Sequence, residues 1–225
     1  TAHATESTNI TASVNEKVTK IYFEDGQHVN AGDILVELNQ SEEKAELKRA
    51  QAVRGERKLT LDRLLKLEKQ QLTAPDVIDR TRLELEQAEA SISAIKTRIQ
   101  DRLIRAPFDG IVGLREISVG TLVESGDIIT TLDDTRQIKL DFTVPSVFLP
   151  ELKPGLHINA RAPALNDKKF EGQVQNLDSR IDPLTRSIKV RSLLPNPNGL
   201  ILPGQLMQEN LLYKTRQALE VPEAA

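Results

Sequence analysis

The apolar positions of this chain change their spacing twice, and each change predicts a different kind of element. Up to about residue 40, apolar and polar side chains alternate over short runs such as residues 18–23, which is typical of β-strands. From Ser41 the spacing becomes helical. Four apolar residues then recur at intervals of seven: Ile78, Leu85, Ile92 and Ile99. Such a heptad seam predicts a coiled-coil helix. Short alternating strands return after residue 103 and continue to residue 213.

The two strand-like regions on either side of the helices share a repeated motif. Its copies cover residues 26–38 and 120–132, and six identities lie at a constant offset of 94, the separation of Gly26 and Gly120. The pairs are Gly26 and Gly120, Val29 and Val123, Gly32 and Gly126, Asp33 and Asp127, Ile34 and Ile128, and Leu38 and Leu132. The glycines suit turns with positive φ, and the valines are expected to face inward. One copy is too small to bury its apolar side, so the two are predicted to pack as a β-sandwich.

The segment between the two copies must leave the sandwich and return to nearly the same place. Residues 41–102 are therefore predicted to form an antiparallel helical hairpin. Ser41 is the expected N-cap of its first helix, and Thr73 with Asp76 resembles a capping box for the second, where Pro75 suits the first turn. About 30 residues per helix give a hairpin of roughly 40–45 Å.

The last third of the chain is rich in short strands punctuated by Pro and Gly. About six strands and one short helix are predicted in residues 135–213, which favours a small antiparallel β-barrel. Residues 133–135 (Asp133-Asp134-Thr135) are interpreted as a linker. The predicted fold class is mainly β plus an α-helical coiled-coil hairpin.

Composition excludes several classes of function. The net charge is −3 and the isoelectric point about 5.7, so nothing indicates binding to nucleic acid. The absence of Cys excludes disulfides and thiolate metal sites, and 3 His with 1 Met argue against other transition-metal sites. No apolar run of 18 residues appears. Both ends look internal to a longer chain, so targeting information is expected to lie elsewhere.

Catalysis has little support in the sequence. His3 lies in an expected tail, whereas His28 and His157 lie in different domains without a nucleophile arrangement. The adjacent carboxylates of residues 42–43 and 133–134 point in different directions and fit a helix start and a linker better than an acid–base pair. The protein is therefore predicted not to be an enzyme and to need no cofactor.

Residues along nearly the whole chain resemble the membrane fusion proteins, or periplasmic adaptors, of bacterial tripartite efflux pumps. The resemblance rests on the split repeat, on the string Ala106-Pro107-Phe108-Asp109-Gly110, and on strings in the barrel region. Those are residues 170–174 (FEGQV), 181–187 (IDPLTRS), 190–191 (VR), Asn196 and 202–205 (LPGQ). They are most similar to adaptors that serve proton-driven resistance-nodulation-division (RND) pumps.

The resemblance implies an elongated chain of four parts. These are a lipoyl-like domain (residues 14–40 and 103–134), a helical hairpin (41–102), a six-stranded antiparallel β-barrel (135–213) and part of a membrane-proximal domain (1–13 and 214–225). The implied protein is periplasmic, is attached to the inner membrane and forms a ring. It links an inner-membrane RND transporter to an outer-membrane channel for export of drugs or other small molecules. Hinges are expected at residues 39–40, 105–106 and 133–135.

The resemblance also implies a channel-binding site at the hairpin tip. Related adaptors often carry Arg, then Leu four residues later and Ser seven after that, which here correspond to Arg63, Leu67 and Ala74. Ala replaces the Ser, and Thr73 is the neighbouring residue that offers a hydroxyl. A solvated helix charge explains Arg63 about equally well.

A second candidate site lies in the barrel loop with Asp182 and Arg186. These residues form either a local ion pair or a contact with the pump, and the ion pair is the favoured interpretation.

Two alternatives to an RND adaptor stay open. One is a biotinyl or lipoyl carrier domain, but its modified lysine would have to be Lys44, which is expected in a first helical turn instead of an exposed hairpin. The other is an adaptor of an ATP-driven exporter or secretion system, which often has a longer hairpin or a membrane helix. Metal efflux is disfavoured by the single Met207 and the lack of Cys.

Overall fold

The computed structural model describes residues 1–211, which belong to two compact units. Among the described residues, unit 1 contains Thr1–Thr8, Asp109–Val112 and residues 132–211, and unit 2 contains Asn9–Phe108 and Gly113–Thr131. Two strands, β1 (Ala2–Thr11) and β8 (Ile128–Pro145), run through both units. The expected membrane-proximal residues 214–225 lie outside the described residues.

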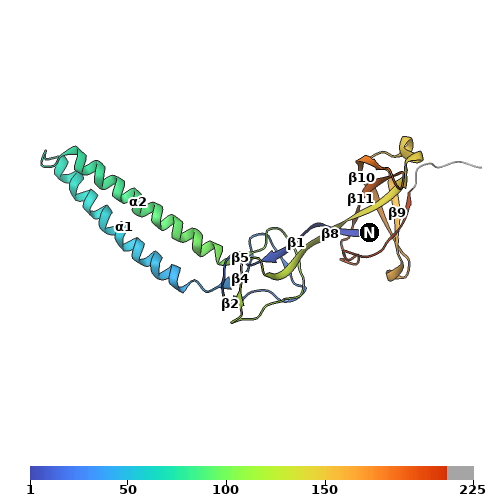
Figure 1. Cartoon of the computed structure of the whole chain (residues 1–225), viewed down its shortest axis with the longest axis horizontal. Helices are drawn as coiled ribbons and strands as arrows, with labels where there is room; N and C mark the ends of the chain where they lie inside the picture. Colours follow the sequence, from blue (N-terminus) through green and yellow to red (C-terminus); the bar gives the residue numbers. More distant parts are fainter. Residues whose placement is uncertain (212–225) are drawn as a thin grey trace, which may run out of the picture. The chain divides into compact units, whose positions relative to one another are not determined.

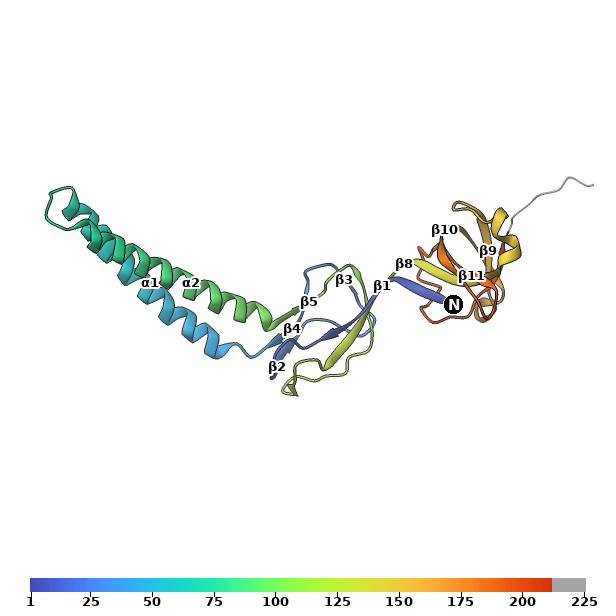
Figure 2. The same ribbon diagram turned by 45° about the horizontal axis from the view of Figure 1, so that its top comes forward.

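Unit 2 consists of a small β-structure that carries the helical hairpin (Figure 1). Its four-stranded antiparallel sheet has the order β5-β4-β2-β7. The strands of this unit are β2 (Glu16–Ile21), β3 (His28–Val29), β4 (Ile34–Leu38), β5 (Leu103–Arg105) and β7 (Leu122–Val123). As Figure 2 shows, β4 leads into one helix and the other helix leads back into β5, so the hairpin is an insertion between paired strands.

The sequence repeat is a repeat of backbone geometry. All four turn glycines have positive φ: Gly26 (75°), Gly32 (87°), Gly120 (90°) and Gly126 (98°). In the first copy, the backbone N–H of Gly32 donates to the Ala106 carbonyl (2.8 Å), and that of Ala106 donates to the Asp33 carbonyl (3.0 Å). The same two bonds recur, 94 residues apart, between Gly126 and Ala12 (2.9 Å) and between Ala12 and Asp127 (3.0 Å).

The core positions of the two copies are equivalent as well. In six pairs at the 94-residue offset, both side chains are less than 10% exposed. These pairs are Ala12 and Ala106, Val18 and Val112, Phe23 and Ile117, Val29 and Val123, Leu35 and Ile129, and Leu38 and Leu132. These six pairs show that the two copies bury apolar side chains at the same positions of the motif.

The hairpin contains α1 (Ser41–Glu68) and α2 (Pro75–Asp101). The predicted seam is confirmed in part: Ile78, Thr81, Ile92 and Ile95 are buried, whereas Leu85 and Ile99 are half-buried. Four ion pairs join the helices: Glu43–Arg102, Glu46–Arg98, Arg54–Glu89 and Arg57–Glu84. The acidic partners are on α1 near the base and on α2 near the tip, so a shifted register would bring like charges together.

Both predicted side-chain caps are wrong. The N-cap of α1 is Gln40, and that of α2 is Ala74 in an extended conformation; neither makes a side-chain capping bond. The hydroxyl of Ser41 instead lies 2.8 Å from the Asn39 amide oxygen. Pro75 is at the start of α2 as predicted, because its missing N–H and fixed φ suit the first turn.

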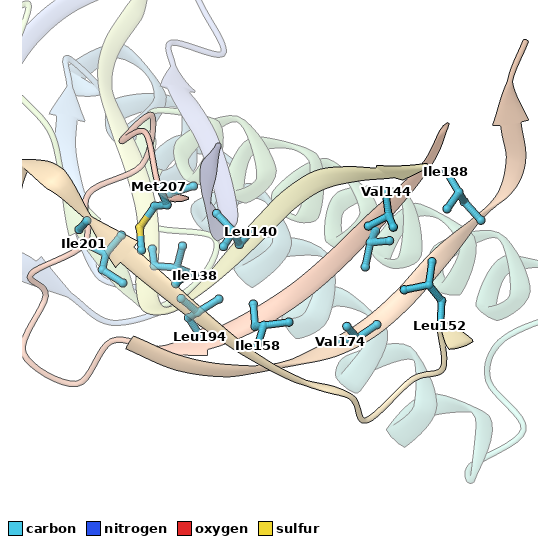
Figure 3. Packing of buried hydrophobic residues seen from close by; sticks show 14 residues of the cluster. Ile138, Leu140, Val144, Leu152, Ile158, Val174, Ile188, Leu194, Ile201 and Met207 are labelled. Atoms are coloured by element: carbon cyan, nitrogen blue, oxygen red, sulfur yellow. The ribbon is translucent and has the colours of Figure 1, made fainter. Parts of the chain in front are cut away.

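Unit 1 is an antiparallel β structure around one apolar core. Its strands follow the order β12-β9-β10-β11-β8, and β1 also pairs with β8. The remaining elements are β6 (Gly110–Val112), η1 (Ser146–Glu151), β9 (His157–Ala162), η2 (Pro163–Leu165), β10 (Lys168–Asp182), β11 (Ser187–Pro195) and β12 (Gln208–Leu211). Figure 3 shows side chains from β8, β9, β10 and β11 gathered in one interior, together with Ile201 and Met207.

One assignment near the unit boundary differs from the sequence prediction. Residues 133–135 are part of the continuous strand β8 instead of a linker, and Arg136 binds the carboxylate of Asp134 through Nε (2.9 Å) and Nη2 (2.8 Å). Residues Thr1–Thr8 cluster with unit 1, where the Thr5 hydroxyl donates to the Gln137 carbonyl (2.8 Å). Neither α1 nor α2, the two α-helices within residues 1–211, is long and apolar enough to cross a membrane.

Candidate functional site

The hairpin tip has a defined backbone. The N–H of Leu72 donates to the Leu67 carbonyl (3.0 Å) and the N–H of Gln71 to the Glu68 carbonyl (2.8 Å), the bond pair of a Schellman motif. Gln71 occupies the left-handed position with φ of 60°, where glycine is usual. The tip is therefore a fixed turn held by the last carbonyls of α1.

Three of the four predicted tip residues are exposed. Arg63 and Ala74 are exposed, Leu67 is 39% exposed, and Thr73 is intermediate. Within residues 1–211 no carboxylate forms an ion pair with Arg63. Leu72, at the turn, is 68% exposed as well. It was not predicted as a tip residue, although its place between the end of one helix and the start of the next was a signal for it. The tip thus presents apolar and basic side chains to solvent.

The base of the hairpin is held by a buried ion pair. Nη2 of Arg102, at the end of α2, lies 2.6 Å from Oε1 of Glu43 in the first turn of α1. Arg102 also donates from Nη1 to the Arg98 carbonyl (3.0 Å), and its own carbonyl accepts the N–H of Leu38 (2.9 Å). The junction therefore ties both helices to strand β4.

A second polar network joins Tyr22, directly after β2, and Gln40, the N-cap of α1, to Glu37 of β4. Tyr22 donates to Glu37 (2.7 Å), and the buried Gln40 side chain donates to the other oxygen of the same carboxylate (2.6 Å). These hydrogen bonds lower the pKa of Glu37, and the Tyr22 bond raises the pKa of that phenol. Gln40, which lies in the expected hinge at residues 39–40, is therefore buried and hydrogen-bonded.

Lys44 does not occupy a carrier-type turn. It lies in the first turn of α1, as the sequence predicted, and its Nζ is 3.7 Å from Glu37. Among residues 1–211, no three His, Asp or Glu side chains form a metal-binding group. His28 and His157 belong to different units.

The β10–β11 loop corrects the prediction for Asp182 and Arg186. The Asp182 carboxylate accepts the backbone N–H groups of Leu184 (2.8 Å) and Thr185 (3.1 Å), and these bonds lower its pKa. The favoured ion pair with Arg186 is absent within residues 1–211; the Arg186 N–H instead donates to the Asp182 carbonyl (2.8 Å), with Arg186 at φ of 51°. Asp182 is therefore a turn-forming residue.

A split β-structure with a helical hairpin inserted, followed by an antiparallel β unit, is the architecture of membrane fusion proteins. A family model for the barrel-sandwich hybrid domain of RND membrane fusion proteins matches residues 6–132, and one for the CusB-like β-barrel domain matches residues 137–215. The chain belongs to the RND membrane fusion protein family.

Curated relatives include the multidrug resistance protein MdtA of Escherichia coli (strain K12 / DH10B) and of Shigella boydii serotype 18. Each is 31% identical over an alignment that covers 100% of this chain and 60% of the relative. The chain thus spans about 60% of the length of these relatives.

Solved structures agree on the fold. A MacA-MexA chimeric protein with the Pseudomonas aeruginosa MexA α-hairpin matches with a TM-score of 0.83 at 19% identity, covering 95% of this chain and 78% of that one. The membrane fusion protein Spr0693 of Streptococcus pneumoniae R6 matches with a TM-score of 0.76 at 15% identity, covering 96% and 97%.

Proposed function

We propose that this protein is the periplasmic adaptor of a tripartite multidrug efflux pump. It links an inner-membrane RND transporter to an outer-membrane channel and acts without catalysis of its own. The main support for this proposal is that two family models of RND adaptor domains match the chain one after the other. The first covers the split repeat and the hairpin, and the second covers the β unit. The naming of the MdtA relatives as multidrug resistance proteins supports drugs as the exported class.

In this proposal the hairpin tip binds the channel. Leu67 and Leu72 supply the apolar contact, and Arg63 supplies a cation that forms no ion pair within residues 1–211. Ala74 caps α2 through its backbone conformation, so the Ser of related tips is not needed for the turn. Thr73 remains the nearest hydroxyl for a polar contact.

The β unit, with residues 135–213 as a six-stranded barrel, contacts the transporter, and several copies form a ring around the transport path. The four-part domain division and the anchoring to the inner membrane belong to the same proposal. Both matching family models name RND domains, and this favours an RND adaptor over an adaptor of an ATP-driven exporter or secretion system.

The experiment is complementation of an adaptor-deleted strain with the full-length protein, scored by drug susceptibility. Arg63→Asp and Leu67→Ser are expected to accumulate normally and to lose efflux. Lys58→Asp and Leu59→Ser serve as matched controls, because both residues are exposed on α1 below the tip, and these variants are expected to export like wild type.

The outcomes separate the parts of the proposal. Export by the tip variants would overturn the tip assignment. A wild-type protein that restores no efflux would overturn the adaptor function itself.

A further inference from the structure

A cavity of about 270 Å³ lies in unit 1 between the carboxyl end of β8, helix η1 and strand β12. Its wall is mostly apolar: Phe142 and Val144 come from β8, Leu152 follows η1, and Leu211 comes from β12. The volume is close to the lower end of the range of about 300–1,000 Å³ that is typical of small-molecule pockets, and such pockets combine apolar walls with a few polar groups. The cavity therefore has the size and the lining of a small-molecule site.

Strand β12 contributes a carboxylate to this wall. Side chains alternate between the two faces of a strand, so Glu209 lies on the same face of β12 as Leu211. Both line the cavity and are partly buried, whereas the residues of the other face, Gln208 and Asn210, are exposed. The backbone of β12 pairs with β9, where Ala160 is opposite Glu209. A paired strand thus presents the carboxylate to the cavity.

The charge of the cavity lining is negative. Among the described residues that line the cavity, the ionisable ones are Glu151 and Glu209. Neither forms an ion pair within residues 1–211. Burial raises the pKa of the Glu209 carboxyl, and the amino group of Thr1 offsets this only in part. Because a carboxylate that leaves water without a counterion is costly, a cation beside Glu209 would be stabilised.

An organic cation fits this lining better than a metal ion or an anion does. No group of three His, Asp or Glu side chains that could hold a metal ion occurs within residues 1–211. An anion would be repelled by the carboxylates of Glu151 and Glu209. An aromatic ring such as that of Phe142 attracts a cation that lies over its face, and the apolar wall removes the hydrocarbon part of a ligand from water.

We propose that this cavity binds one small organic cation, whose ammonium group pairs with Glu209 while its apolar body lies against Phe142 and Leu211. The exposed carboxylate of Glu151 adds to the attraction. The inference goes beyond the proposed function, because it gives the protein a ligand of its own in addition to the two membrane proteins that it links.

The test is a ligand-observed nuclear magnetic resonance titration of the full-length protein with benzyltrimethylammonium, a permanent cation that carries one aromatic ring. We expect saturable binding to the wild-type protein. Glu209→Gln keeps the shape of the side chain and removes its charge. It is expected to weaken cation binding about tenfold, because charge-assisted contacts are stronger than neutral ones. Benzyl alcohol, a neutral compound with the same ring, is expected to bind the wild type and Glu209→Gln with similar affinity.

Two further variants complete the test. Glu171→Gln is the matched control, because Glu171 is an exposed carboxylate of the same unit that does not line the cavity, and it is expected to bind the cation like wild type. Phe142→Leu keeps an apolar side chain and removes the ring, so it is expected to weaken cation binding several-fold. Circular dichroism checks the folding of each variant, and Phe142→Leu keeps the test decisive if Glu209→Gln does not fold.

Four results would overturn the inference. The first is a wild-type protein that shows no saturable cation binding, and the second is equal affinity in the wild type and Glu209→Gln. The third is an equal loss in Glu171→Gln, which would indicate unspecific attraction to surface carboxylates. The fourth is self-association of the wild-type protein in analytical ultracentrifugation that Glu209→Gln abolishes, without saturable cation binding, since a second copy would then fill the cavity. Complementation by the wild-type protein is scored separately, so the proposed function stands or fails independently of these results.

Discussion

The buried ion pair at the hairpin base provides a quantitative test of how the hairpin is attached. At 2.6 Å between Glu43 and Arg102, the Coulomb attraction is about 6 kcal/mol for an effective dielectric constant of 20, before desolvation is subtracted. The side chains are 9% and 16% exposed, so Glu43→Leu leaves a largely buried cation. Removing one partner of a buried pair costs about 3–5 kcal/mol. Because Arg102 keeps some solvent contact, we expect a loss near 3 kcal/mol.

Urea unfolding followed by circular dichroism at 222 nm measures this loss, since α1 and α2 are the α-helices of the described chain. With a slope of about 1–3 kcal/mol per M, a loss near 3 kcal/mol lowers the urea midpoint by about 1–3 M. The double variant Glu43→Leu with Arg102→Met is expected within about 1.5 kcal/mol of wild type, because it removes both charges. The control Glu46→Leu breaks the more exposed pair with Arg98 and is expected to cost below about 1 kcal/mol. If the urea midpoint of Glu43→Leu equals that of Glu46→Leu, the Glu43–Arg102 ion pair does not hold the base of the hairpin.

Three further predictions concern the backbone and one surface pair. Gly172→Ala is expected to lower the free energy of unfolding by about 2–3 kcal/mol in chemical denaturation, because the added Cβ would lie 2.5 Å from a backbone oxygen of β11. Gly55→Ala has free space around its Cβ and is expected to raise the free energy of unfolding by about 0.5–1 kcal/mol. Gln71→Gly is expected to raise the helix melting temperature slightly by relieving the positive φ, and equal behaviour of Gln71→Ala would argue against that cause. The pKa of Asp141 is lowered by Arg191 at 2.7 Å, so the stability from this pair is present above the ordinary pKa of about 3.9 and is lost as pH falls through the lower folded value. The stability gap between wild type and Asp141→Asn should therefore shrink from pH 7 to pH 3, and a constant gap would contradict the assignment.

The parts of the fold that follow from local spacing could be predicted from the sequence. The 94-residue offset identified the glycines that need positive φ and the inward valines, because turn chemistry and burial leave a direct trace in residue type. The heptad seam identified α2 for the same reason. Helix caps could not be predicted this way: Thr73 matches a capping pattern, but the Schellman turn before it determines where α2 begins.

Interaction partners that residue type does not reveal explain the remaining errors. Asp133 and Asp134 resemble a linker by composition, yet both lie in β8, where Arg136 binds the Asp134 carboxylate and residue 133 pairs with Ile111. Likewise, Asp182 and Arg186 have opposite charges at a helical spacing, but the loop uses the carboxylate for its own N–H groups. In both cases the partner was a backbone or side-chain group that composition does not identify. The exposed Leu72 was missed because sequence alone does not separate an exposed leucine from a core one.

Site-specific cross-linking in cells tests the central claim most directly. The chain has no cysteine, so Leu72→Cys places a single thiol at the hairpin tip and Lys96→Cys places one near its base. With a reagent that carries one maleimide and one photoreactive diazirine, in a strain that expresses the transporter and channel, we expect Leu72→Cys to cross-link to the outer-membrane channel and Lys96→Cys not to do so. A functional Leu72→Cys adaptor that forms no link to the channel would contradict the claim that this protein joins transporter to channel through its hairpin tip.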